Sequence, residues 1–225
     1  MRFALRLSLP DRRGVLSAVA SAIGRAGGNI ISLDVIGSVD GVAVDDITVE
    51  ADTDAVALRI AIEQVPSVVV ETVMAAQDFR DPAAPLELAA QMVVAGSGAV
   101  PLLVEGLPAA LWASWAIVVA STHTGPEIIH SSARPPDVGG LETPWMPLEQ
   151  VRRLPRAPWM PQAWRQLADL QVVAAPLAQR NTAVVLARDN GPRFLDSEVT
   201  QLARLATIAV RVEVLGAQSG TAVSG

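Results

Sequence analysis

Two positions near the N-terminus have the chemistry to bind the charged ends of a small zwitterion. Gly14 precedes an apolar helical segment, and because glycine has no side chain it leaves the free backbone amides at the helix start open to a carboxylate. Asn29 offers an amide oxygen that can accept from an ammonium group and an amide nitrogen that can donate. Together the two positions suit the main-chain groups of an amino acid.

The same stretch, DRRGVLSAVASAIGRAGGNI at residues 11–30, also has a purely structural interpretation. Asp11 could cap the helix, and Gly14 could give the turn room. Gly27 and Gly28 could end the helix with a left-handed residue. For Gly27 and Gly28 we favour that structural role.

The elements that position these residues follow from the hydrophobic pattern of residues 1–79. The pattern predicts an alternating strand over 3–9, a helix over 13–26, strands at 29–38 and 42–51 around the Asp40-Gly41 turn signal, a helix from Thr53 that Pro66 ends, and a strand over 67–74. This order folds into an antiparallel four-stranded sheet with both helices on one face, the ferredoxin-like arrangement. One sheet face stays bare, and a unit this small usually covers such a face or extends its sheet by pairing with a second copy.

Residues 3–74 resemble an ACT domain, a regulatory module that binds amino acids in many biosynthetic enzymes. The motif is an Asp, a Gly three residues later, an apolar helix, and Gly-x-Asn-Ile at the second strand, in LPDRRGVLSAVASAIGRAGGNI followed by ISLDVIGSVDGVAVDDITVE. The resemblance implies a ligand at a dimer interface, between the first loop and helix start of one subunit and the second strand of its partner. It implies a lining of Asp11, Arg12, Arg13, Gly14, Val15, Leu16, Asn29 and Ile30.

This resemblance favours ligand binding over a structural role for the pair Gly14 and Asn29. One position departs from the family, because Arg13 stands where a proline is common. The loop is then either less rigid or carries an extra positive charge toward an anion.

Residues 86–216 resemble a GAF domain. The sequence predicts a helix over 86–100, strands over 111–121 and 127–133, an irregular middle over 134–166, a strand pair at 170–179 and 182–188, and a closing helix that Asp196 caps and Gly216 ends. GAF domains bind small molecules, or bind none and dimerise through their first and last helices. The chain has no cysteine to tether a chromophore and no defensible nucleotide-binding signature, so we expect a degenerate, dimerising version.

The predicted fold class is therefore α+β, an N-terminal ferredoxin-like βαββαβ ACT domain followed by a C-terminal α/β GAF-like domain. The proline-punctuated segment 80–85 is predicted to link domains over 1–79 and 86–216. The small, polar segment 217–225 is predicted to be a disordered tail.

The composition limits the partners and the compartment. A net charge of -6 and a pI near 4.9 argue against a nucleic-acid surface. The most apolar run, residues 107–120, is shorter than the roughly 20 residues of a membrane span, and the N-terminus lacks the pattern of a signal peptide. The absence of cysteine suits a reducing compartment, so we expect a cytoplasmic protein. All 17 basic residues are arginine, which indicates a GC-rich, bacterial genome.

The irregular middle interleaves aromatic and basic side chains. These are Trp145, Trp159 and Trp164 with Arg152, Arg153, Arg156 and Arg165. They could form a surface for a partner, an anion or single-stranded nucleic acid. We favour the alternative, in which tryptophan and proline hold an irregular lid over the sheet while the arginines face water.

Other patterns offer weaker chemistry. His123 and His130 flank a predicted turn with Glu127 between them and could hold a metal, although two ordinary strand histidines are the favoured interpretation. The sequence GSVDG at 37–41 fits a nucleophile pattern but lies between two strands, where that chemistry does not occur. We therefore assign no catalytic residue, metal ligand or cofactor.

Two functions from different classes remain. The first is a non-catalytic sensor that binds an amino acid at an ACT dimer interface and regulates a separate protein. The second is an interaction or assembly protein whose two domains only mediate dimerisation. An enzyme ranks third, because no pair of nucleophile and base can be assembled from the sequence.

Overall fold

A computed structural model describes residues 1–75, 83–133, 137–177, 181–189 and 191–221. The chain divides into two compact units, Met1–Arg80 and Asp81–Gly225. Part of the segment predicted as a linker lies outside the described residues, and its last two residues already belong to the first helix of the second unit, which begins at Ala84.

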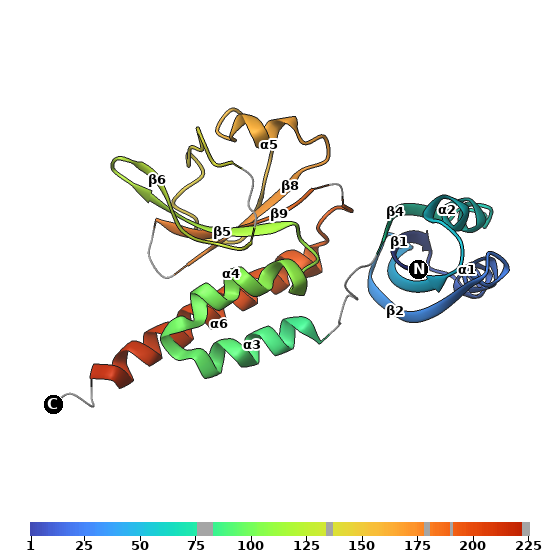
Figure 1. The fold of residues 1–225 in the computed structure, drawn as a ribbon, viewed down its shortest axis with the longest axis horizontal. Coiled ribbons are helices and arrows are strands. Elements are labelled where there is room, and N and C mark those ends of the chain that lie inside the picture. Colours follow the sequence, from blue (N-terminus) through green and yellow to red (C-terminus); the bar gives the residue numbers. More distant parts are fainter. Residues whose placement is uncertain (76–82, 134–136, 178–180, 190, 222–225) are drawn as a thin grey trace. The chain divides into compact units, whose positions relative to one another are not determined.

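The N-terminal unit has the predicted order of strands and helices. Its elements are β1 (Arg2–Pro10), α1 (Val15–Arg25), β2 (Gly28–Val39), β3 (Val42–Ala51), α2 (Ala55–Glu63) and β4 (Val69–Ala75). The strands form an antiparallel sheet in the order β2-β3-β1-β4. Both helices cover one face of this sheet (Figure 1). The ferredoxin-like prediction is therefore confirmed.

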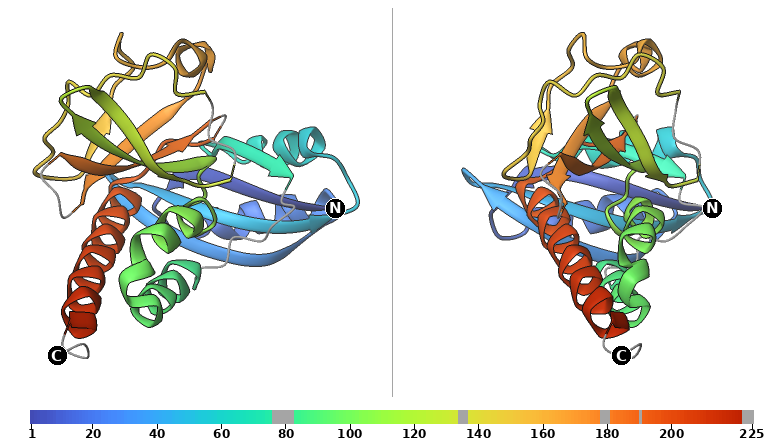
Figure 2. Two further views of the ribbon diagram at one scale, coloured as in Figure 1. Left: turned by 60° about the vertical axis from the view of Figure 1, so that its left-hand side comes forward. Right: turned by 90° about the vertical axis from the view of Figure 1, so that its left-hand side faces the viewer.

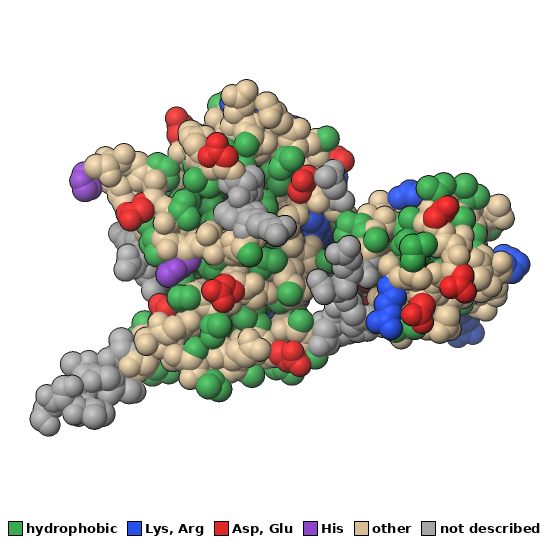
Figure 3. Space-filling model, in the orientation of Figure 1, with side chains coloured by type: hydrophobic (Ala, Val, Ile, Leu, Met, Phe, Trp, Pro, Cys, Tyr) green, Lys and Arg blue, Asp and Glu red, His purple; other side chains and the backbone are tan. Residues whose placement is uncertain are grey.

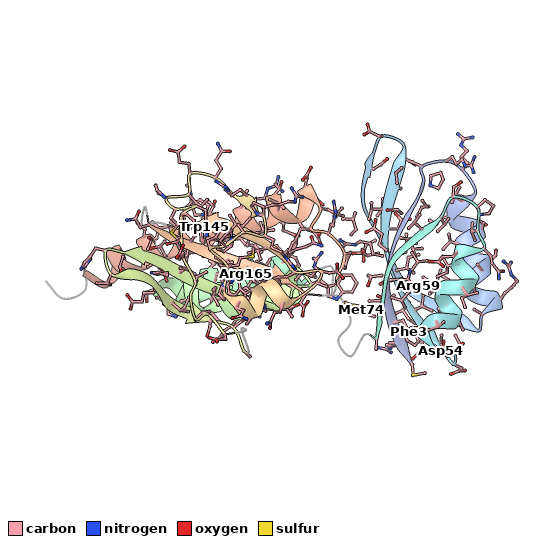
Figure 4. The ribbon with its side chains drawn as sticks, turned by 90° about the horizontal axis from the view of Figure 1, so that it is seen from above. Phe3, Asp54, Arg59, Met74, Trp145 and Arg165 are labelled. Carbon is pink, nitrogen blue, oxygen red and sulfur yellow. The ribbon has the colours of Figure 1, made fainter. Side chains whose placement is uncertain are left out.

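The core of this unit lies between the sheet and its helices. Alternation along β1 turns Phe3, Leu5, Leu7 and Leu9 toward the helices, where all four are buried. The stripe of α1 packs onto them through Val15, Val19, Ala22 and Ile23. At the start of α2, Asp54 Oδ1 accepts the Ala57 N–H at 2.8 Å, a normal helix cap (Figure 4).

One glycine of the predicted helix end is required by packing. A Cβ atom at Gly28 would lie 2.7 Å from Ile23 Cγ2 and 2.8 Å from Val49 Cγ1. Gly27, just before it, has a φ of 79°. The structural role favoured for these two glycines is thus what the geometry shows.

The opposite face of the sheet carries a buried ion pair. Arg6 and Asp46 are directly opposite residues on β1 and β3. Arg6 Nε lies 2.6 Å from Asp46 Oδ1, and Arg6 Nη2 lies 2.7 Å from Asp46 Oδ2. This bidentate geometry satisfies both carboxylate oxygens of Asp46.

The C-terminal unit is a five-stranded antiparallel sheet between two different layers. Its elements are α3 (Ala84–Ala95), η1 (Gly96–Gly98), α4 (Ala99–Ala110), β5 (Trp115–Thr122), β6 (Gly125–Ser131), β7 (Arg152–Leu154), α5 (Gln162–Gln166), β8 (Gln171–Pro176), β9 (Thr182–Arg188) and α6 (Asp196–Thr221). The strand order is β6-β5-β9-β8-β7. Helices α4 and α6 cover one face, and α3 packs on these two helices (Figure 1 and Figure 2). Both sheets of the chain are antiparallel, so the α+β class is confirmed.

Tryptophan side chains fill the space between the other sheet face and the irregular segments. The ring centroids of Trp115 and Trp164 lie 4.6 Å apart, and those of Trp145 and Trp159 lie 5.8 Å apart. All four rings belong to one buried cluster. The arginines of this region, Arg152, Arg153, Arg156 and Arg165, are exposed. The lid interpretation is therefore the right one, and Figure 4 shows Trp145 and Arg165 in this layer.

The helix predicted over 86–100 is present as α3, but its predicted end is wrong. The α-helix ends at Ala95, a short 3-10 turn follows at Gly96–Gly98, and a second helix, α4, begins at Ala99. Gly106 lets α4 approach α3, since a Cβ atom there would lie 2.5 Å from Leu88 Cδ1. The run Ala84–Ala110 has the length and apolar composition of a membrane span, with 27 residues. In the fold, however, it is two helices that pack on each other and supply core residues such as Leu103 and Leu107.

The predicted end of the closing helix is also wrong. Helix α6 continues to Thr221, so part of the predicted tail is helical, and residues 222–225 lie outside the described residues. Gly216 serves packing instead of termination. A Cβ atom there would lie 2.9 Å from the Ser97 backbone nitrogen. Asp196 is not the cap either, because it is the first helical residue.

Candidate functional site

The loop between β1 and α1 is held against the β2–β3 hairpin by Asp11. The Asp11 N–H donates to the Gly41 carbonyl at 2.8 Å, and Ser38 Oγ donates to Asp11 Oδ2 at 2.8 Å. Asp11 therefore does not cap the helix, contrary to the structural interpretation of the sequence. Its carboxylate instead joins the loop to the end of β2.

Gly14 leaves the start of α1 open. It is the N-cap residue, with φ 90° and ψ -17°, and no side chain of the described residues caps the helix there. A Cβ atom at Gly14 would meet no other atom within 4 Å, so the space above it is free. The first turn of α1 contains no acidic residue. Amides without a side-chain cap at the positive end of a helix favour an anion.

The remaining predicted residues of this loop divide into two groups. Arg12 and Arg13 are exposed beside Gly14, where they add positive charge. Val15 is buried in the core, and Leu16 packs partly against it. The structure therefore assigns Val15 to the core of the unit and not to the lining of an open site.

Asn29 lies at the far end of the sheet from Gly14. Asn29 pairs with Glu50 on β3, whereas Pro10, which leads into the loop, pairs with Val42. Residues 42 and 50 are eight steps apart on β3, roughly 27 Å at about 3.4 Å per residue. Ile30, next to Asn29, packs partly against the core. The two halves of the predicted site can therefore meet only if a second copy supplies one of them.

Asp45 is a residue that the sequence reasoning missed. It follows Ala43 and precedes Ile47 on the core face of β3, and it pairs with Leu7 and Val35. Asp45 is only 2% exposed, and among the described residues its Oδ1 atom has no hydrogen-bond partner. The signal was available in the pair Asp45-Asp46, which places an acid on each face of a buried strand.

The environment of Asp45 opposes its ionisation. Burial raises the pKa of the Asp45 carboxyl above its ordinary value, and the negative charge of Asp11 raises that pKa further. A buried carboxylate oxygen without a hydrogen-bond partner, such as Asp45 Oδ1, is costly because the described residues do not replace the hydration it has lost.

We expect Asp45→Asn to remove a pH dependence of stability. Because the folded pKa is raised, the native state binds more protons than the unfolded state between about pH 4 and the folded pKa. The free energy of unfolding therefore falls as pH rises through that window, by about 1.4 kcal/mol for each unit of pKa difference. Urea unfolding of the wild type and of Asp45→Asn across this pH range measures how the free energy of unfolding changes with pH.

The control for this measurement is Asp52→Asn, which removes an exposed carboxylate from the same unit. The stability of Asp45→Asn relative to the wild type should increase with pH, whereas Asp52→Asn should follow the wild type. A difference between Asp45→Asn and wild type that stays constant with pH would contradict the assignment.

The histidines do not converge. Figure 3 shows the two histidine side chains, in purple, at separate places on the C-terminal unit. Among the described residues there is no group of three or more His, Cys, Asp or Glu side chains that could hold a metal ion.

A family model described as the ACT domain matches residues 3–66. The N-terminal unit is therefore an ACT domain, and the resemblance drawn from its motif is confirmed. No curated protein matches the sequence significantly.

The chain is similar to three solved structures from the two families that its motifs resemble. One is an ACT domain protein from Streptococcus pneumoniae, at 22% identity over 34% of this chain and 90% of that one, with a TM-score of 0.30. Another is a GAF domain from Pseudomonas syringae pv. tomato, at 19% identity over 64% of this chain and 94% of that one, with a TM-score of 0.45. The third is the GAF domain of an Acinetobacter phosphoenolpyruvate-protein phosphotransferase, at 11% identity over 59% and 94%, with a TM-score of 0.44.

Proposed function

We propose that this protein is a non-catalytic sensor that binds an amino acid between the ACT domains of two copies and regulates a separate protein. The observation that carries the proposal is the uncapped start of α1 beside Gly14, which is open to a carboxylate. Regulation by small-molecule binding is the general role of ACT domains, which often act as dimers. The composition favours the cytoplasm as its compartment.

Strand β2 supports the proposed pairing of two copies. It is an edge strand of the sheet, and it exposes two large hydrophobic residues, Ile31 and Val35. An edge strand presents unpaired backbone groups, which a second copy can satisfy around a two-fold axis.

Such pairing would also complete the site. Antiparallel contact about the middle of β2 (Gly28–Val39) sets residue 29 of one copy opposite residue 38 of the other. Ser38 is bonded to Asp11. The carboxamide of Asn29 from the second copy would thus reach the loop that contains Gly14, which is some 27 Å away within one chain.

A thermal shift assay with the twenty amino acids tests this proposal. A ligand that binds only the native state at about 100 times its Kd adds about 2.7 kcal/mol to the free energy of unfolding, so one amino acid should raise the Tm. Asn29→Ala should abolish that rise, because it removes the carboxamide of the site. Gly14→Val should also abolish it, because the new side chain fills the open space above the helix start and cannot adopt the φ of 90° without strain in the loop.

The matched control is Asn181→Ala, which removes an exposed carboxamide from the C-terminal unit. This variant should keep the full response. A Tm that none of the twenty amino acids raises would contradict the proposal, and so would a rise that survives both Asn29→Ala and Gly14→Val.

A ligand-free assembly protein is the second candidate. It is favoured by exposed hydrophobic side chains outside the candidate site, which Figure 3 shows in green along the helical layer of the C-terminal unit. On α3 these include Leu86, Val93 and Val94. Sedimentation equilibrium separates the candidates, since an assembly protein would dimerise with the same affinity whether or not amino acids are present.

A further inference from the structure

The outer face of α2 carries two large hydrophobic side chains that lie outside the core of the N-terminal unit. Val56 and Ile60 are one helical turn apart, and their exposed fractions are 64% and 55%. Leu58 and Ile62, on the opposite side of the same helix, are fully buried. Side chains at this spacing form a ridge, which we call the Val56–Ile60 ridge, and it is free to pack into the surface of another molecule.

The outer face of α1, which packs beside α2, has side chains small enough to receive such a ridge (Figure 1). Its exposed residues before Arg25 are Ser17, Ala18, Ser21 and Gly24. A Cβ atom at Gly24 would meet no atom within 4 Å, so packing within the described residues does not require glycine there. Because glycine is less favourable than alanine in a helix, its presence on this face fits the close approach of another surface.

The ends of the two helices carry opposite charges. The arginines at 12–13 are exposed just before α1, and Arg25 is its exposed last residue. Asp54 is exposed just before α2, and Glu63 is its exposed last residue. Glu63 also pairs with Arg59 of its own helix, but both side chains of that pair are largely exposed, so it can still meet a second cation. The helical face is thus basic along α1 and acidic at both ends of α2.

These charges select one way of stacking the helical faces of two copies. Helices α1 and α2 run in opposite directions, because they lead from β1 and β3, which are antiparallel. A two-fold axis parallel to the helices places α1 of one copy antiparallel on α2 of the other, so every basic end meets an acidic end. An axis across the helices places α1 on α1 and α2 on α2, where like charges meet at every end. The first arrangement is therefore favoured.

We propose that this helical face is an interface between two copies of the chain, in which α1 of each copy packs antiparallel on α2 of the other. With the helix midpoints opposite each other, Ser21 of one copy lies level with the Val56–Ile60 ridge of its partner. Arg25 then lies level with Asp54. The interface goes beyond the proposed function, because it uses neither strand β2 nor an amino-acid ligand. Together with pairing through β2, it joins two dimers into a tetramer.

Engineered cysteines test this contact directly, because the chain has no cysteine of its own. Ser21→Cys and Ile60→Cys, both at exposed positions, are oxidised as full chains, each alone and as an equimolar mixture. We expect cross-linked pairs in the mixture and few in either protein alone, because each disulfide needs the two side chains to face each other. Ser21→Cys mixed with Glu87→Cys, at an exposed site of the C-terminal unit, is the control for random collision.

Two outcomes of this experiment would overturn the inference. A mixture that cross-links no more than the control would show that the helical faces do not meet. Cross-linking of Ser21→Cys alone to the level of the mixture would place α1 on α1 and reject the proposed arrangement.

Sedimentation velocity separates this interface from the pairing at β2. Ile60→Lys sets a positive charge against the basic face of α1, and it should weaken association at the helical face at least about tenfold. Val35→Arg, at an exposed position of the edge strand β2, should weaken only the pairing of the proposed function. Adding Ile60→Lys to Val35→Arg should therefore weaken association further.

The two variants fail in distinguishable ways. If Ile60→Lys changes the self-association of neither the wild type nor Val35→Arg, the inference is overturned, whatever amino acids do to the Tm. If Ile60→Lys weakens association and Val35→Arg does not, the helical interface stands and the β2 pairing of the proposed function fails.

Discussion

Glu198→Ala is expected to lower the free energy of unfolding of the C-terminal unit by about 3–5 kcal/mol. Glu198 is buried and bonds in two directions, with Oε1 accepting from Arg188 Nη2 at 2.9 Å and Oε2 accepting the Leu195 N–H at 2.7 Å. The second bond caps α6 from its third residue, as in a capping box. Removal of the carboxylate takes away the charge that Glu198 places beside the buried Arg188 guanidinium, and it takes away the acceptor for the Leu195 N–H at the start of α6.

Tryptophan fluorescence during urea unfolding measures this loss of stability in the C-terminal unit. All five tryptophans of the chain follow residue 81, so the signal reports the C-terminal unit alone. Glu198→Gln should cost less, because it retains an acceptor for the Leu195 N–H. Glu149→Ala, at an exposed site, serves as the control. A loss for Glu198→Ala no larger than that for Glu149→Ala would show that the network does not stabilise the fold.

Trp164→Ala should destabilise the same unit by a similar amount, about 3–5 kcal/mol. Trp164 is completely buried at the centre of the tryptophan cluster, and its ring lies tilted at 4.6 Å from Trp115. Its removal leaves a cavity beneath the irregular segments, whose buried side chains pack in this cluster. We expect the near-ultraviolet circular dichroism of the cluster to weaken together with the urea midpoint.

Trp164→Phe is the matched comparison, because it retains an aromatic ring and removes only part of the volume. It should lose less than half as much stability as Trp164→Ala if packing is the cause. If both variants lose the same amount, or if neither loses any, the cluster does not hold the lid on the sheet.

The sequence predicted the N-terminal unit well because its signals are local. Alternation in β1, the stripe of α1 and the turn at Asp40-Gly41 each specify a backbone state within a few residues. The C-terminal unit was harder to predict. The apolar run over 99–120 covers α4 and most of β5, and its hydrophobic periodicity does not change between the helix and the strand. Pro108, which argues against a helix, lies inside α4 near its end.

The sequence named the residues of the candidate site, but it did not predict where they lie relative to one another. Gly14 was recognised from its place before an apolar helix, and the structure leaves it open as expected. Its separation from Asn29 depends on the pairing of β1 with β3, which involves residues about 40 positions apart in sequence. Asp45 was missed for a related reason. The doublet Asp45-Asp46 indicates one acid on each face of the strand, but only the pairing of β1 with β3 shows that Arg6 bonds Asp46 and that Asp45 lies on the core face.

The bonds from Asp11 to Ser38 and Gly41 have a consequence for how the protein would respond to its ligand. They join the β1–α1 loop to the end of the edge strand β2 and to the turn that follows it. A ligand that immobilises the loop would then also favour association of two chains, and association would raise ligand affinity by the same factor. The response of such a sensor would depend on its own concentration as well as on that of the amino acid. The amino-acid concentration that half-saturates it would fall as the concentration of the protein rises.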